Sequence, residues 1–190
     1  MKLKDICRDK ICKGIRIITD KTEEEIDAYV IETKDVENCS IRFTKPESKI
    51  RMKIDNKFFL KNDDIIIASI PSSNTNHVGY CRDIGDEKVI IKKNFFILRN
   101  MDKSKYNPEF VAEYLEQIGM EEAKANKINK DFVADDIEKI DIPNISIEKQ
   151  NQLVALLRPI NERNELYHKM INNCEEIKRY MILEVTKDEK

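Results

Sequence analysis

Apolar residues recur every seven positions through the C-terminal part of the chain, and this repeat constrains the fold more than any other feature. The repeat consists of Leu153, Ile160, Tyr167, Cys174 and Met181, with Leu156, Met170 and Ile177 at the companion position three residues further on. Such a repeat is typical of an α-helix that packs along a second helix. About 40 residues at ~1.5 Å per residue would form a rod of about 60 Å. We therefore expect one long helix over 146–185.

Two arrangements could bury the apolar repeat. Charged residues such as Glu162, Glu165 and Arg179 take the other faces of the predicted helix, which favours a projecting helix that binds a partner. The alternative is a pair of antiparallel helices inside a core. Pro159 lies within the repeat, and proline removes a helix hydrogen bond, so we expect it to kink or split the helix near Leu156.

The first hundred residues have the pattern of short strands separated by polar loops. The segments rich in Ile, Val and Phe are 28–36, 49–54, 64–70 and 88–98. The predicted fold class is therefore α+β. A mixed α/β domain with short, mostly antiparallel strands is expected over 1–146, and a long helix of the coiled-coil type over 147–190.

A second, shorter helix is predicted over residues 107–120. Asn107 can cap this helix, and Pro108 suits its first position. Phe110, Val111, Tyr114, Leu115 and Ile118 would share its apolar face. Further along the chain, Pro143 disfavours helix at Ile142, which predicts an extended segment before the long helix.

Charge is nearly balanced over the whole chain but not locally. The 190 residues carry a net charge of −2, which argues against a uniformly basic protein that coats DNA. Residues 42–61, however, hold seven cationic side chains against two carboxylates. Such a segment fits a surface that contacts phosphates, and it fits a solvated strand pair equally well. The candidate phosphate contacts are Arg42, Lys45, Lys49, Arg51 and Lys53.

The polar loop 71–82 is the candidate for sequence recognition. Its side chains Ser72, Ser73, Asn74, Asn76, His77 and Arg82 belong to types that hydrogen-bond base edges. The same residue types are ordinary in loops, so the loop could equally be a hydrogen-bonded turn.

Motifs that would indicate catalysis are missing from the sequence. It contains no Gly-rich phosphate or cofactor loop, no Gly-x-Ser-x-Gly and no Asn/Asp-Pro-Pro-aromatic motif of amino-methyltransferases. The nuclease-like tripeptide Glu47-Ser48-Lys49 is expected by chance in a chain with 37% charged residues. We predict no catalytic residue, no cofactor and no metal site.

The cysteines and the absence of long apolar runs bear on location. Five cysteines, an odd number with no Cys-x-x-Cys pair, indicate reduced structural thiols. No apolar run approaches the ~18–20 residues of a membrane span, and charges interrupt the N-terminal segment. We expect a cytoplasmic protein without a membrane partner.

Five motifs follow one another along the chain in a familiar order. They are Leu3-Lys4-Asp5-Ile6, the strand-like segment 62–69 with the later step Val78-Gly79, the segment 93–99 that ends in Arg99, the helix-like segment 107–115, and Ile140-Asp141-Ile142-Pro143 followed by Glu148-Lys149-Gln150 and the long helix. This order resembles one half of the specificity subunit of type I restriction–modification systems. The last motif is the most specific of the five. In three departures, Asn62-Asp63 stands where the family has a glycine before the aspartate, the segment after Pro143 contains less proline, and Pro159 interrupts the helix.

The resemblance implies a function without catalysis. The domain would enter the major groove of double-stranded DNA and read one half of a bipartite site. The helix would space it from a second such domain and dock methyltransferase subunits, and a restriction subunit would add nuclease activity. A half-subunit with one domain and one helix is expected to form a homodimer, which would make the site palindromic.

Two other hypotheses stay open at this point. The chain could be a truncated decoy that binds methyltransferase subunits without reading DNA. It could also be an enzyme, either a stand-alone nuclease or a methylation component, although the missing motifs argue against it.

Overall fold

The computed structural model describes residues 1–16, 25–26, 28–41, 50–51, 54–70, 76–125 and 131–187, and for residues 25, 26, 50, 51 and 187 it describes the backbone alone. The chain divides into two units, Met1–Val154 and Ala155–Lys190. Small, mostly antiparallel sheets, short helices and one long C-terminal helix confirm the predicted α+β class.

A four-stranded antiparallel sheet lies at the centre of the first unit. Its strand order is β1 (Cys12–Lys13), β10 (Phe95–Leu98), β7 (Ile65–Ala68) and β8 (Val78–Tyr80). Strand β7 has the sequence IIIA and is buried at every residue, as expected for an inner strand that is covered on both faces. In β8, a Cβ on Gly79 would lie 2.7 Å from Cγ1 of Ile41, so a larger residue here would force the Ile41 side chain to move.

Three pairs of short strands accompany this sheet. Strand β3 (Tyr29–Ile31) runs parallel to β9 (Val89–Ile91), β4 (Val36–Glu37) pairs antiparallel with β5 (Ser40–Ile41), and β2 (Glu25–Ile26) pairs antiparallel with β6 (Ile50–Arg51). Each of the four predicted strand segments contains at least one strand. The predicted segment 88–98 is two strands, β9 and β10, because a turn at residues 92–94 separates them.

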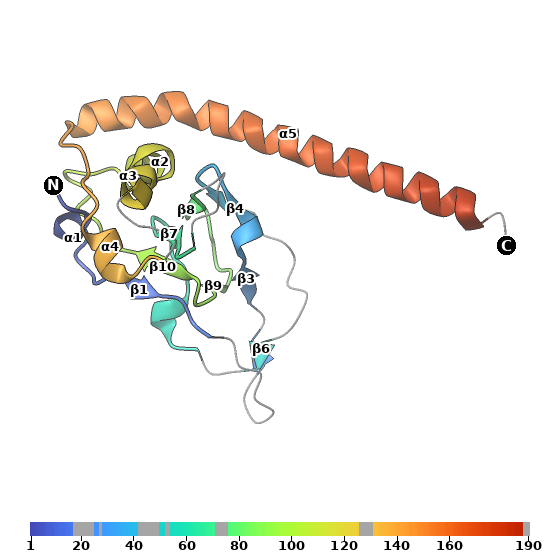
Figure 1. Ribbon diagram of the computed structural model, residues 1–190, viewed down its shortest axis with the longest axis horizontal. Coiled ribbons are helices and arrows are strands. Elements are labelled where there is room, and N and C mark those ends of the chain that lie inside the picture. The colour runs from blue at the N-terminus through green and yellow to red at the C-terminus, as the bar shows by residue number, and fades with distance from the viewer. Residues whose placement is uncertain are drawn as a thin grey trace. The chain divides into compact units, whose positions relative to one another are not determined.

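The core is divided between the two faces of the central sheet. Ile65 and Ile67 of β7 pack with the helices, whereas Ile66 and Ala68 pack on the other side with β3 and β9. In Figure 1, α2 (Pro108–Tyr114) and α3 (Met120–Ala125) lie above β7 and β10. The period-2 alternation of a strand therefore separates a helical layer from a layer of short strands.

The predicted helix 107–120 is present, but it contains one wide turn. The side chain of Asn107 accepts hydrogen bonds from the backbone N–H of Glu109 at 2.9 Å and of Phe110 at 3.3 Å, and Pro108 occupies the first turn, as predicted. Residues Leu115–Gly119 then form a π-helical turn. A π turn inserts an extra residue and rotates the following side chains. Ile118 is therefore 49% exposed, contrary to the prediction that it lies on the buried face.

The beginning of the chain pairs with the extended segment before the long helix. The backbone N–H of Ile142 donates to the carbonyl of Met1 at 2.7 Å, and Leu3 donates to the carbonyl of Ile140 at 2.9 Å. Helix α1 (Leu3–Ile6) then buries Leu3 and Ile6, and α4 (Ala134–Glu138) buries Ile137 in the same core. The extended conformation predicted around Pro143 is confirmed.

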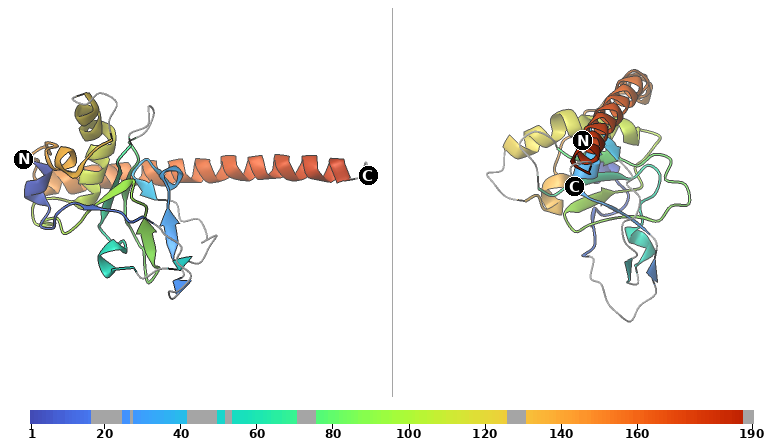
Figure 2. Two further views of the ribbon diagram at one scale, coloured as in Figure 1. Left: turned by 60° about the horizontal axis from the view of Figure 1, so that its bottom comes forward. Right: turned by 90° about the vertical axis from the view of Figure 1, so that its right-hand side faces the viewer.

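Helix α5 (Ile147–Lys187) runs unbroken for 41 residues (Figure 2). Pro159 lies inside it, so of the two predicted outcomes, a kink or a split, the split is wrong. Proline leaves the carbonyl four residues earlier, here that of Ala155, without its helical donor. Because Ala155 is exposed, water can bond this carbonyl and the helix continues.

Candidate functional site

Much of the predicted DNA-contacting surface lies outside the described residues. Arg42, Lys45, Lys49 and Lys53 are not among them, and Arg51 is described only as part of β6, where its backbone pairs with Glu25. The described end of the basic segment is the 3₁₀ turn η2 (Asn56–Phe58) and the residues that follow it. Two cationic side chains there, Lys57 and Lys61, are exposed to solvent.

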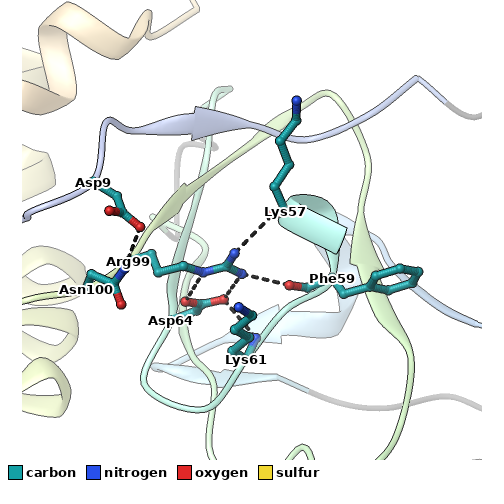
Figure 3. A network of polar contacts seen from close by, with 7 residues as sticks. All are labelled: Asp9, Lys57, Phe59, Lys61, Asp64, Arg99 and Asn100. Carbon is teal, nitrogen blue, oxygen red and sulfur yellow. Dashed lines mark hydrogen bonds and ion pairs between the residues drawn. The ribbon is translucent and has the colours of Figure 1, made fainter. Parts of the chain in front are cut away.

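A buried ion pair anchors this end of the basic segment to the central sheet (Figure 3). The guanidinium of Arg99 donates through Nε to Oδ1 of Asp64 at 2.7 Å and through Nη2 to the second carboxylate oxygen. It also donates to the carbonyl oxygens of Lys57 at 3.1 Å and Phe59 at 2.7 Å. The pKa of Arg99 is raised, first by its hydrogen bond to Asp64.

The carboxylate of Asp64, the residue just before β7, also holds the backbone of Lys61. Asp64 accepts a hydrogen bond from the backbone N–H of Lys61 at 2.8 Å, and its side chain is 2% exposed. The pair therefore holds the backbone at residues 57, 59 and 61. We expect a fixed backbone to reduce the entropy that exposed lysines lose when they bind phosphate.

The polar loop is described only in its second half. Ser72, Ser73 and Asn74 lie outside the described residues. Asn76 is 4% exposed, and its side-chain amide donates to the carbonyl oxygen of Glu116. His77 adopts a φ of 50°, and its Nδ1 lies 2.8 Å from the carbonyl oxygen of Val36. These contacts give Asn76 and His77 a structural role in holding the loop.

Glu116 fastens the loop to the π-helical turn. Its carboxylate accepts the backbone N–H of Val78 at 2.8 Å and that of Asn76 at 3.4 Å. Burial is the largest influence on this group and raises its pKa. Glu116 is not among the residues predicted from the sequence, because a carboxylate in a helix is usually solvated and nothing in the local pattern distinguishes a buried one.

Arg82 is the remaining candidate in the loop, and its guanidinium already has an acidic partner. Its guanidinium forms an ion pair with Glu109, whose side chain is 7% exposed. It also lies 5.7 Å from the centre of the Tyr80 ring. The Arg82 side chain is 39% exposed, so it keeps a face toward solvent.

The apolar repeat of α5 is exposed along its length. The exposed fractions of its members range from 40% at Leu153 to 69% at Leu156. Ile160, Tyr167, Met170, Ile177 and Met181 fall between these values, and Cys174 is exposed as well. A row of apolar side chains open to solvent indicates an interaction surface.

Within the first unit, Gln150 joins the start of α5 to the cap of α2. It is fully buried, and its Nε2 donates to the carbonyl oxygens of Ile145 at 2.7 Å and Lys105 at 2.9 Å. The side chain of Asn107 donates to that of Asn151 at 2.8 Å. Gln150 belongs to the motif Glu148-Lys149-Gln150 of the family resemblance, but the sequence did not predict the hydrogen bonds that its side chain makes.

The described residues bear on metal ligands, thiols and membrane spans in turn. Among these residues, no group of three or more His, Cys, Asp or Glu side chains is arranged to hold a metal ion. All five cysteines are free thiols, and burial raises the pKa of Cys7 to about 12. None of the described helices has the length and apolar character needed to span a membrane.

Solved structures with a similar arrangement of helices and strands identify the fold of this chain. The HsdS subunit from Thermoanaerobacter tengcongensis matches 90% of this chain with a TM-score of 0.61 at 14% identity. The chain has the fold of an HsdS subunit. A second match, a chain from a structural study of complex assembly and conformational transition of the type I R-M system, covers 90% of this chain with a TM-score of 0.63 at 13% identity. No protein-family profile matches the sequence, and neither does any curated protein.

This chain spans 43% of the length of each of these two structures. One of the two residues of the departure Asn62-Asp63 has an unusual backbone conformation. Asp63 adopts a φ of 70°, a conformation that favours glycine. Its carboxylate accepts a hydrogen bond from the hydroxyl of Tyr80 at 2.6 Å and pairs with Lys103, and these contacts hold the strained residue.

Proposed function

We propose that this chain is a non-catalytic DNA sequence-specificity subunit of a type I restriction–modification system. The observation that carries the proposal is the extent of the structural likeness. The matches cover 90% of the chain, which is more than Met1–Val154 contains, so they include part of Ala155–Lys190. A likeness that combines a strand-rich domain with a long helix is more specific than a likeness to either part.

In this proposal the first unit reads one half of a bipartite site in double-stranded DNA. The segment 42–61 supplies phosphate contacts and the loop 71–82 supplies base contacts, of which Asn74 and Arg82 are the strongest candidates. Phosphate contacts set affinity and base contacts set sequence preference. The buried anchors Arg99–Asp64 and Glu116–Val78 support this division, because they fix the described ends of the two segments.

The second unit binds partners through the apolar repeat of α5. We propose that it pairs with α5 of a second copy and also docks methyltransferase subunits, with a restriction subunit joining the same complex. Leaving this row of side chains wet would be costly at ~25 cal/mol per Å² of apolar surface. The complex acts in the cytoplasm, where the DNA is.

Selection from a pool of random DNA duplexes tests the proposal. The purified protein is mixed with the pool together with the modification subunit of a type I system from the same genome, and the bound duplexes are sequenced. A bipartite, palindromic motif around a fixed spacer is expected. A complex with the modification subunit that enriches no motif would instead make this chain a decoy, and cleavage of the pool by this chain alone would make it a nuclease.

A further inference from the structure

The β1 edge of the central sheet carries a second concentration of positive charge, outside the segment 42–61. Residues 8–16, here called the edge segment, contain one carboxylate, that of Asp9, and four exposed cationic residues, Arg8, Lys10, Lys13 and Arg16. The edge segment lies along β10. At one end the N–H of Arg8 donates to the carbonyl of Asn100 at 3.0 Å, and at the other the N–H of Gly14 donates to that of Phe95 at 2.9 Å. Strand β1 is the outermost strand on this side of the sheet.

The alternation of a strand assigns these cations to two faces of the sheet. Lys13 lies over the ring of Phe96, 5.5 Å from its centre, and Phe96 packs with the helices. Cys12 packs on the opposite side, with β3 and β9. Successive side chains of a strand point to opposite faces. Continuing the register of β1 and β10 by two residues places Lys10 opposite Arg99, on the face of Cys12 and away from Lys13.

The described end of the basic segment lies on the same face as Lys10. In Figure 3, Asp9 lies beside Arg99, which donates to backbone carbonyls in and just after η2. Further along the edge segment, Ile15 and Phe58 of η2 pack in one apolar cluster, and Arg16 follows Ile15 directly. Two separate contacts therefore hold the edge segment against the η2 turn.

Three cationic side chains around this junction form no ion pair with a residue that the structure describes. They are Lys10, Arg16 and Lys61. The nearby carboxylates have partners of their own. Asp9 accepts a hydrogen bond from the side chain of Asn100 at 2.6 Å, and Asp55 pairs with Lys57 at 3.1 Å. Unpaired cations that lie together produce a positive local potential, which attracts anions.

Lysine on an edge strand can also serve a purpose that needs no ligand. It keeps the open edge from pairing with a strand of another protein. That role would account for Lys10, but it gives no reason for the unpaired charge of Lys61, which lies outside β1 and beside the Arg99–Asp64 pair (Figure 3). A shared ligand accounts for both.

We propose that Lys10, Arg16 and Lys61 bind phosphates of double-stranded DNA, so that the edge segment and the segment 42–61 form one surface along the sugar–phosphate backbone. This inference rests on the DNA binding proposed above and extends its contact surface to the N-terminal strand. The ligand is DNA because the edge segment is held against the segment to which the phosphate contacts are assigned. The six residues from Lys10 to Arg16 span up to about 20 Å at ~3.3 Å per residue, the rise of about six base pairs.

The salt dependence of DNA binding tests these contacts. The full chain, together with the modification subunit used for the selection above, is titrated with a labelled duplex in fluorescence anisotropy at several salt concentrations. The triple variant Lys10→Gln, Arg16→Gln, Lys61→Gln should reduce the steepness of log K against log salt by about 2.7, because each lost phosphate contact contributes about 0.9. The matched control, Lys13→Gln, Lys139→Gln, Lys149→Gln, removes the same charge from exposed positions and should keep the wild-type slope.

Lysine acetylation, measured by mass spectrometry, tests the surface in the wild-type protein. The full chain is treated with an acetylating reagent in complex with the modification subunit, once with the duplex and once without it. Lys10 and Lys61 should lose most of their reactivity when the duplex is bound, because phosphates cover their amines. Lys13, on the other face of the sheet, should react equally in both samples. A third sample holds the chain without the modification subunit and without DNA.

The outcomes separate this inference from the proposed function. A wild-type slope in the triple variant would overturn the inference, leave DNA binding in place and give Lys10 the role of guarding the edge. An equal loss of slope in the matched control would show a general effect of charge and would overturn it as well. Protection of Lys10 and Lys61 by the modification subunit without DNA would assign the surface to that protein. A wild-type complex that binds no duplex would overturn the proposed function itself.

Discussion

The side-chain carbonyl of Gln150 accepts a hydrogen bond from the backbone N–H of Asn107 at 2.9 Å, which ties the first turn of α5 to the cap of α2. Asn107 is itself the cap of α2, so one buried amide joins two helices through residues that are 43 positions apart in sequence. Within the first unit, the start of α5 is therefore held to the cap of α2 by this contact.

Replacing Gln150 by alanine should destabilise the first unit. The change would leave the N–H of Asn107 and the carbonyls of Lys105 and Ile145 without this partner, and each buried unsatisfied group costs about 1–3 kcal/mol. We expect a loss of about 2–4 kcal/mol in urea unfolding. Gln152→Ala, an exposed change on the same helix, is the control and should shift stability by less than about 0.5 kcal/mol. Equal effects of the two changes would contradict the role of Gln150.

Breaking the Arg99–Asp64 pair should destabilise the sheet and the basic segment together. Asp64→Asn would leave a guanidinium that is 13% exposed without its countercharge. Removing one partner of a buried pair costs about 3–5 kcal/mol. Thermal unfolding measures this effect. Asp55→Asn, which removes the partner of Lys57 in an exposed pair, should cost less than about 1 kcal/mol.

DNA binding should depend on salt through the segment 42–61. Each phosphate contact that is lost lowers the slope of log K against log salt by about 0.9. We expect lower slopes for Lys45→Gln, Lys49→Gln, Arg51→Gln and Lys53→Gln in fluorescence anisotropy with a labelled duplex. Lys139→Gln, within an acidic segment, is the control. If all four variants keep the wild-type slope, this segment faces away from DNA.

The two asparagines of the loop should respond differently to alanine. Asn74→Ala should lower the preference for the selected site over a scrambled site by roughly ten- to hundred-fold, the ~1–3 kcal/mol of a good base contact. Asn76→Ala should instead lower the unfolding temperature, because this side chain is buried against Glu116. Binding measured at a temperature where both variants are folded separates the two effects. A wild-type site preference in Asn74→Ala would leave Arg82 as the loop candidate.

Stability should fall with rising pH through the titration of Glu116. Its pKa in the folded protein is raised from 4.5 by burial, so the folded state holds this proton more tightly than the unfolded state does. The contribution is fully present below pH 4.5 and is lost as the pH rises through the folded pKa. Glu116→Gln should remove this part of the pH dependence of the free energy of unfolding. Asp86→Asn, an exposed change, should leave it in place.

Local patterns in the sequence determined the long helix, the helix that begins after Asn107 and four of the strand-bearing segments. The cap at Asn107, the extended segment around Pro143 and the seven-residue repeat of α5 were all predicted, because capping, proline geometry and apolar periodicity depend on neighbouring residues. The chain alone also indicated which face of α5 is apolar. It did not show that α5 passes Pro159 unbroken, since that outcome depends on the exposure of the backbone around Ala155.

Only the tertiary structure decided which polar residues are buried and what they bond. Arg99 meets Asp64, Gln150 meets Asn107 and Glu116 meets Val78 across separations of 35 to 43 residues. In the sequence these side chains look like solvated surface residues, because charge and amide chemistry give no local sign of burial. Their partners are brought together by the pairing of β7 with β8 and β10 and by the packing of the helices on that sheet, so the anchors of the proposed binding segments depend on long-range contacts.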